Sequence, residues 1–140
     1  MSGGRQLGCV SACALLAATG MRVAGNRDRI PPVFAGLKSA ITCIPGPVDG
    51  ERMTRYHLVW SAARDNVTRS SRIVYDVYRA ESPGRETFSR ATYTTRRGAT
   101  TFTTPPLSST KTHYFVVRAR DAAGNRDRNR VERPGVNPCV

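Results

Sequence analysis

The chain of 140 residues is poor in the residue types that carry most catalytic and metal-dependent chemistry. It has only two histidines and four cysteines, and aromatic residues make up 7% of it. Nucleophile elbows, phosphate-binding glycine loops, metal-ligand clusters and paired carboxylates on one strand face are all missing. The stretch from Asp121 to Asp127 has some likeness to a calcium loop but lacks the spaced ligands and terminal glutamate of one. We therefore expect no catalytic site, no metal and no cofactor, and predict that the protein is not an enzyme.

Acidic residues and lysine are scarce as well, whereas arginine is abundant. The chain has 22 basic and 10 acidic residues, a formal net charge of +12. Only Lys38 and Lys111 among the basic residues are lysines. This excess favours contact with a polyanion or a negatively charged surface. The uniform use of arginine is equally typical of coding bias.

One apolar run of any length is present, at residues 7–20, with Arg5 before it. Its 14 residues are too few to span a bilayer, which takes about 20 helical residues, but they suit the centre of a secretory signal. We predict a signal peptide over residues 1–20, with a buried helix as the alternative. Lipid attachment stays open, because Thr19 stands where lipoprotein signals have cysteine and Cys13 fits that pattern only locally. The mature chain would be exported to the periplasm, cell surface or medium, with no transmembrane segment.

Removal of this segment would leave two cysteines, Cys43 and Cys139. Neither belongs to a C-x-x-C motif or has a histidine nearby, so zinc and redox sites have no support. A single pair in an exported chain favours a disulfide over free thiols.

From Pro31 onward, short alternating runs are separated by Gly, Pro, Asp, Asn and Ser, a pattern typical of all-β sandwiches and barrels. We expect strands at residues 56–60, 73–78, 100–104, 113–120 and about 129–133, with turns at 81–84 and 121–125. Residues 21–30 contain the sequence AGNRDR, which recurs at 123–128. We interpret 21–30 as a polar linker.

Several of these segments, in this order, resemble a fibronectin type III domain of the bacterial, exported kind. They are Pro31-Pro32, the run LVW at 58–60, YDVYR at 75–79, Leu107, HYFVVRARD at 113–121 and Gly124-Asn125. The resemblance implies one domain over residues 31–140, a seven-stranded antiparallel immunoglobulin-like sandwich. In it, strands A, B and E would pack against C, F and G with C′ and enclose Trp60.

The sequence departs from this family at one corner. The family usually has a tyrosine six residues after the leucine of the E–F corner, and its hydroxyl bonds to the backbone. Counted from Leu107, that position is His113. We predict that a ring nitrogen of His113 makes the same bond, rather than acting as a catalytic base.

Adjacent strands C, F and G would place polar residues on one outer face. The candidate binding face consists of Tyr78, Tyr114, Arg118, Arg120, Arg128 and Arg130. Arginines beside exposed aromatic rings suit sulfate, phosphate or acidic sugars. An ordinary solvated sheet face is the alternative.

These features predict a non-catalytic exported module that contacts a surface protein or acidic polysaccharide in adhesion or assembly. A passive spacer or stability unit of the bacterial envelope, without its own ligand, is the alternative. We expect no nucleic acid partner, because no recognition helix or stacking platform is present. The sequence does not determine the oligomeric state.

Overall fold

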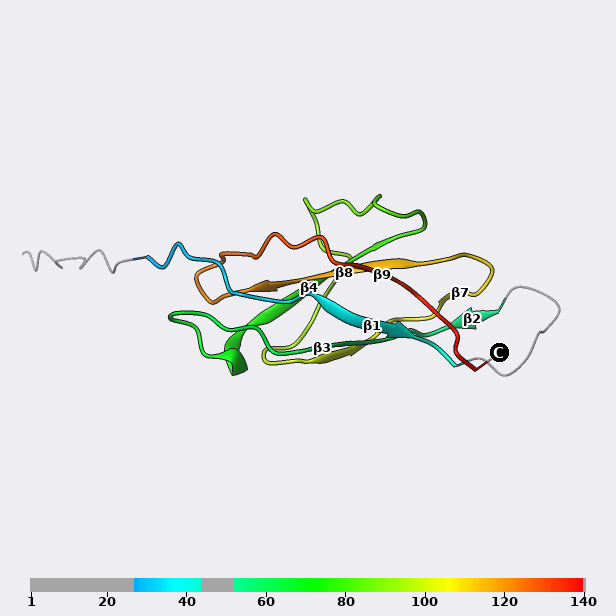
Figure 1. Cartoon of the computed structure of the whole chain (residues 1–140), viewed down its shortest axis with the longest axis horizontal. Helices are drawn as coiled ribbons and strands as arrows, with labels where there is room; N and C mark the ends of the chain where they lie inside the picture. The colour runs from blue at the N-terminus through cyan, green and yellow to red at the C-terminus, as the bar shows by residue number, and fades with distance from the viewer. Residues whose placement is uncertain (1–26, 44–51, 140) are drawn as a thin grey trace, which may run out of the picture.

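The computed structural model describes residues 27–43 and 52–139, which form an all-β, sandwich-like structure. In this part of the chain the only helix is η1 (Ser70–Arg72), a single 3-10 turn. No helix of the described residues is long and apolar enough to cross a membrane. The predicted signal peptide, and residues 21–26 of the predicted linker, lie outside the described ranges. Figure 1 shows an elongated body whose described amino- and carboxyl-terminal segments lie at opposite ends.

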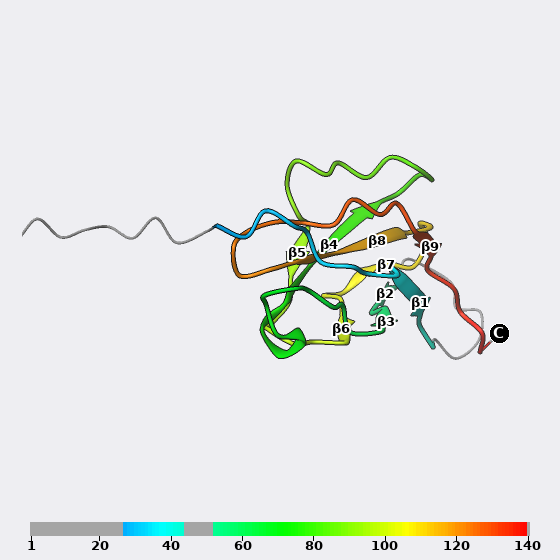
Figure 2. The same ribbon diagram turned by 60° about the vertical axis from the view of Figure 1, so that its left-hand side comes forward.

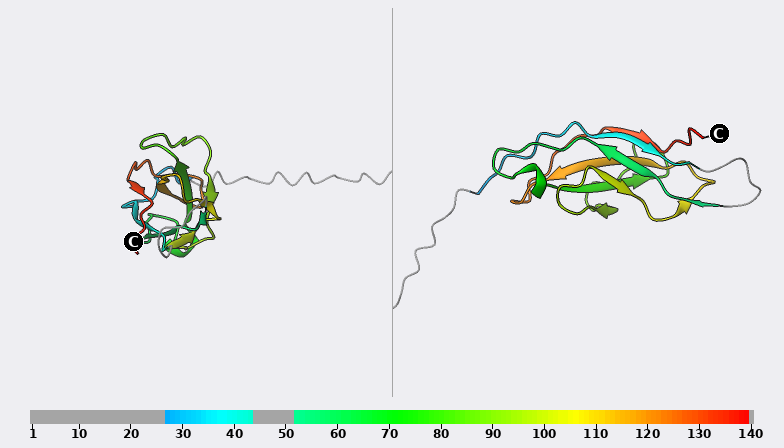
Figure 3. Two further views of the ribbon diagram at one scale, coloured as in Figure 1. Left: turned by 90° about the vertical axis from the view of Figure 1, so that its right-hand side faces the viewer. Right: turned by 90° about the horizontal axis from the view of Figure 1, so that it is seen from below.

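The strands pair antiparallel in three groups. One sheet has the order β1 (Leu37–Ile41), β3 (His57–Trp60), β6 (Thr101–Thr103). A second has the order β5 (Tyr93–Thr94), β4 (Val74–Ala80), β8 (Tyr114–Arg120), β9 (Glu132–Pro134). A separate ribbon joins β2 (Met53–Thr54) to β7 (Leu107–Ser108). The views in Figures 2 and 3 show the two larger sheets as the layers of the body.

Alternating apolar side chains from both larger sheets fill the space between them. Leu37, Leu58 and Trp60 come from one sheet, and Tyr75 and Phe115 from the other; all are at most 2% exposed. The rings of Trp60 and Tyr75 lie 5.2 Å apart, and the indole Nε1 donates a hydrogen bond to the carbonyl of Ala99 at 3.0 Å. The predicted burial of Trp60 is therefore confirmed. Burial of this apolar area is the main force that holds the two layers together.

The strands differ from the predicted ones in number and at several boundaries. The two larger sheets hold seven strands, and the unpredicted β2–β7 ribbon brings the total in the described residues to nine. The last strand begins at Glu132 instead of about residue 129. The reason is that the Asn129 side chain donates to the Val117 carbonyl at 2.9 Å and takes the place of regular pairing there. Pro134 is the last residue of this strand, and a proline is tolerated there because β9 lies at the edge of the sheet.

The carboxyl-terminal segment returns along β1. The amide of Thr42 donates to the Val136 carbonyl at 2.9 Å, and the amide of Val136 donates to the Ala40 carbonyl at 3.0 Å. Next to this pairing, Cys43 and Cys139 form the predicted disulfide, with their Cα atoms 5.4 Å apart. The bond closes a loop of 96 residues and ties the end of the chain to the first strand.

Candidate binding face

Tyr78 and Arg118 of the predicted face are buried, not exposed. They are 1% and 8% exposed, because Phe88, from the segment between β4 and β5, covers them. Its ring lies 5.0 Å from the Tyr78 ring, and the Arg118 guanidinium lies 3.6 Å from its centroid. Figure 2 shows this segment, residues 81–92, arching out from the four-stranded sheet.

Burial changes the chemistry of both side chains. Burial raises the pKa of the Tyr78 hydroxyl, which has no hydrogen-bond partner. Burial lowers the pKa of Arg118 from a very high starting value, so its guanidinium stays charged. Arg118 also donates through Nε to the Asn129 carbonyl at 2.9 Å. These contacts make Arg118 part of the folded scaffold.

The other predicted residues are divided among three places. Arg130 is exposed and approaches Phe88 from outside, 5.3 Å from the ring centroid. Tyr114 lies at the far end of β8, opposite Ala80 and Pro134. Arg120 and Arg128 lie toward the other end of the sheet. The structure thus brings together only Tyr78, Arg118 and Arg130 of the six.

A buried carboxylate organises the end of the sheet where Arg120 lies. Asp76 of β4 is 1% exposed and accepts hydrogen bonds from Nε of Arg120 at 2.9 Å and Nε of Arg126 at 2.8 Å. Thr94 donates to its second oxygen at 2.9 Å. Burial alone would raise the pKa of Asp76, but these hydrogen bonds and the two positive charges outweigh it, so the pKa is below its ordinary value. The hydrogen bond to Asp76 in turn raises the pKa of the Arg120 guanidinium.

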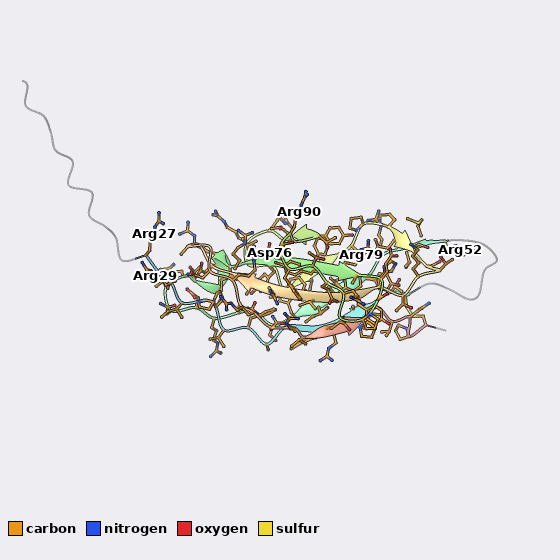
Figure 4. The ribbon with its side chains drawn as sticks, turned by 90° about the horizontal axis from the view of Figure 1, so that it is seen from above. Arg27, Arg29, Arg52, Asp76, Arg79 and Arg90 are labelled. Carbon is orange, nitrogen blue, oxygen red and sulfur yellow. A yellow bond between two sulfur atoms is a disulfide. The ribbon has the colours of Figure 1, made fainter. Side chains whose placement is uncertain are left out.

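Two arginine-lined hollows flank this ion cluster. The first, about 240 Å³, is lined by Arg72, Val74, Arg97, Arg120, Asp121 and Ala122. The second, about 480 Å³, is lined by Arg29, Pro31, Asn125, Arg126 and Arg128. Within the described ranges, Arg72, Arg97, Arg29 and Arg128 form no ion pair. Figure 4 shows Arg29 beside Arg27 at one end of the long axis, with Asp76 farther along the body. We call these the arginine hollows.

The sequence pattern predicts only some of the arginines that line the arginine hollows. Arg120 and Arg128 were identified, but Arg72 and Arg97 were not, because they lie in connections rather than on the alternating strands. Phe88 was missed as well, although an isolated aromatic residue in the polar stretch ESPGRETFSRA was a usable indication. Residues 27–30, predicted as linker, are attached to the body through Asn125, whose Nδ2 donates to the Asp28 carbonyl at 3.0 Å.

The two histidines lie apart and differ in surroundings. His57 is exposed, whereas His113 is 1% exposed. Nε2 of His113 lies 2.9 Å from the Ser108 carbonyl, and Nδ1 lies 2.9 Å from Nη1 of Arg79. Because a carbonyl only accepts and a guanidinium only donates, the ring carries its proton on Nε2. The predicted backbone bond of His113 at this corner is confirmed.

Comparison with known proteins gives one partial match. A segment of 66 residues is 39% identical to part of Exoglucanase B of Cellulomonas fimi. The match covers 47% of this chain and only 5% of that protein's length. No protein-family model matches the chain, and no solved structure matches it.

Proposed function

We propose that the chain is an exported domain of the fibronectin type III kind that works as a non-catalytic binding module for acidic polysaccharide. The strand orders support the fold assignment. The order β1–β3–β6 agrees with strands A, B and E of that family, and β5–β4–β8–β9 agrees with C′, C, F and G. His113, which bonds to the backbone at the corner where the family has tyrosine, supports it too.

The disulfide supports an extracellular or periplasmic location. Such bonds persist in oxidising compartments and are rare in reducing ones. The Cys43–Cys139 bond joins a position just after β1 to a position beyond β9. It therefore acts on the whole domain rather than on a local loop.

The observation that carries the binding proposal is the pair of arginine hollows. Their unpaired arginines present planar donor groups that match sulfate and carboxylate oxygens in bidentate geometry. Asp76 fixes Arg120 and Arg126, one in each hollow, so part of each lining is already ordered. The matched relative is an exoglucanase by name, which supports placing this domain beside polysaccharide.

Salt-dependent retention on immobilised heparin tests this proposal. We expect the Arg72→Glu/Arg97→Glu and Arg29→Glu/Arg128→Glu variants to elute at lower salt than the unmodified chain, with affinity reduced roughly tenfold if each lost contact contributes about 0.7 kcal/mol. Arg118→Glu is unsuitable, because Arg118 is buried under Phe88.

The matched control is Arg85→Glu/Arg90→Glu. Both residues are exposed in segment 81–92 and line neither hollow, and the double change alters net charge by the same amount. If all three variants lose the same affinity for heparin, overall charge rather than the arginine hollows explains the binding. If the unmodified chain is not retained, a passive spacer is favoured. If it is retained and no variant elutes at lower salt, the arginine hollows do not carry the binding. Binding only to a surface protein would replace the polysaccharide as partner.

A further inference from the structure

Three aspartates from distant parts of the chain converge at the end of the molecule where Arg29 lies. Asp28 precedes β1, Asp65 lies between β3 and η1, and Asp121 follows β8. One carboxylate oxygen from each lies within 4.8 Å of the other two. Three negative groups this close repel one another unless a positive charge lies between them.

Nothing in the described ranges supplies that charge. No lysine or arginine there forms an ion pair with Asp28, Asp65 or Asp121. Asp76, by contrast, is neutralised by two arginines. The half-buried Asp28 and Asp65 and the buried Asp121 therefore differ from Asp76, whose single carboxylate has two cationic partners.

Two carboxylate oxygens of the cluster are fully buried without any hydrogen-bond partner. They are Oδ2 of Asp28 and Oδ1 of Asp65, each with less than 1 Å² of accessible surface. The second oxygen of each is satisfied by backbone: Oδ1 of Asp28 accepts from Ile30, and Oδ2 of Asp65 accepts from Val67 and Thr68. A buried oxygen left unpaired is costly, and two such oxygens on adjacent carboxylates are an arrangement that a bound cation would stabilise.

The third carboxylate is held in place by the turn that contains it. Asp121 is 4% exposed. Its Oδ1 accepts from the amide of Asn125 at 2.8 Å, and its Oδ2 accepts from Nδ2 of Asn125 at 2.7 Å. The same Nδ2 donates to the Asp28 carbonyl. The turn at 121–125 therefore orients two of the three aspartates before any ion binds.

We propose that Asp28, Asp65 and Asp121 bind one calcium ion. The donors are all hard oxygens, which excludes a preference for zinc or copper. Calcium takes carboxylate oxygens at about 2.4 Å, so two ligands on opposite sides of it are about 4.8 Å apart. Magnesium requires a tighter octahedron at about 2.1 Å. Calcium would link residues 27–30 to two loops of the domain, and waters would complete its coordination.

Titration of the full chain with calcium chloride after chelator treatment tests this site. We expect one ion per chain by calorimetry, with a Kd of about 0.1–1 mM as in extracellular modules, and weaker binding of magnesium chloride. Calcium at about ten times Kd should raise the melting temperature, and excess chelator should reverse the rise.

Asp28→Asn is the primary variant, because Asp28 precedes the first strand and its loss should leave the sandwich folded. It should weaken calcium binding by about tenfold or more and reduce the calcium-dependent rise in melting temperature. Asp65→Asn should do the same, and the exposed Glu81→Gln should change neither. The proposal is overturned if folded chain takes up no calcium at about 10 mM, if Asp28→Asn binds as the parent does, or if magnesium binds equally well.

Discussion

Asp76 is the residue on which the charged end of the four-stranded sheet depends. Its carboxylate lies between Arg120 and Arg126, and both arginines are about one-third exposed. We expect Asp76→Asn to lower the free energy of unfolding by about 1–3 kcal/mol, since it leaves two partly buried guanidiniums without their acceptor. Urea denaturation measures this, and Glu81→Gln, which removes the surface ion pairs of Glu81 with Arg79 and Lys111, should cause no measurable change. An Asp76→Asn variant as stable as the parent would show that the cluster is not needed for folding.

The pH dependence from Asp76 has a defined sign. Its pKa is lower in the folded chain than the ordinary value of 3.8. The folded state is therefore favoured above that value, and this contribution is lost as the pH falls through the folded-state pKa. Acid unfolding of Asp76→Asn should accordingly be less steep below about pH 4 than that of the parent.

His113 carries a second prediction at this scale. Its ring bonds to the Ser108 carbonyl and to Arg79 and packs 5.6 Å from the Tyr56 ring. His113→Ala should cost about 2–4 kcal/mol, from a buried cavity and two unpaired groups. His57→Ala, on the exposed side of β3, should cost less than about 0.5 kcal/mol. Equal costs for the two substitutions, measured by thermal and urea unfolding, would contradict the role of His113 at the corner.

At the scale of elements, segment 81–92 covers the face of β4 and β8. Phe88 contacts Tyr78 and Arg118, and the amide of Gly84 donates to Glu132 of β9 at 2.6 Å. Glu86 lines the same hollow as Glu132. Burial, and next the neighbouring Glu132 carboxyl, raise the pKa of Glu86 above 4.5.

Because the pKa of Glu86 is raised in the folded chain, its protonated carboxyl favours folding below about pH 4.5. This contribution to stability is lost as the pH rises through the folded-state pKa. We therefore expect Glu86→Gln to be more stable than the parent by roughly 0.5–1 kcal/mol near neutral pH, and equal to it at about pH 4. Urea unfolding at both pH values measures the difference. A gain that is the same at both would contradict the protonation argument.

At the scale of the whole molecule, the disulfide constrains the unfolded chain. Because its loop spans 96 residues, we expect Cys43→Ser/Cys139→Ser to lower the free energy of unfolding by on the order of 4 kcal/mol. Thermal unfolding measures this loss, and a reducing agent should lower the parent to the stability of the double variant without affecting the variant itself. No shift on reduction would mean that the bond adds nothing to stability.

Alternation in the sequence predicted the core, because the period of two along Ile73, Tyr75 and Val77 is a local property. The isolated aromatic ring of Phe88 in a polar stretch indicates a buried side chain, but nothing near it in the sequence indicates that it covers Tyr78 and Arg118. Asp28, Asp65 and Asp121 likewise meet only through the folded topology. The sequence pattern places Asp28 in a linker and Asp121 in a turn, and nothing near either residue indicates that it meets Asp65. Local pattern therefore predicted the layers but not the side chains that gather at their end.

The most direct test of the binding account is an NMR titration of isotope-labelled protein with a sulfated oligosaccharide. We predict saturable shift changes at the amides around five arginines that line the arginine hollows: Arg72, Arg97, Arg120, Arg126 and Arg128. Amides around Arg85 and Arg90 should stay unchanged. Changes spread evenly over all exposed arginines, or no change at saturating ligand, would contradict the account.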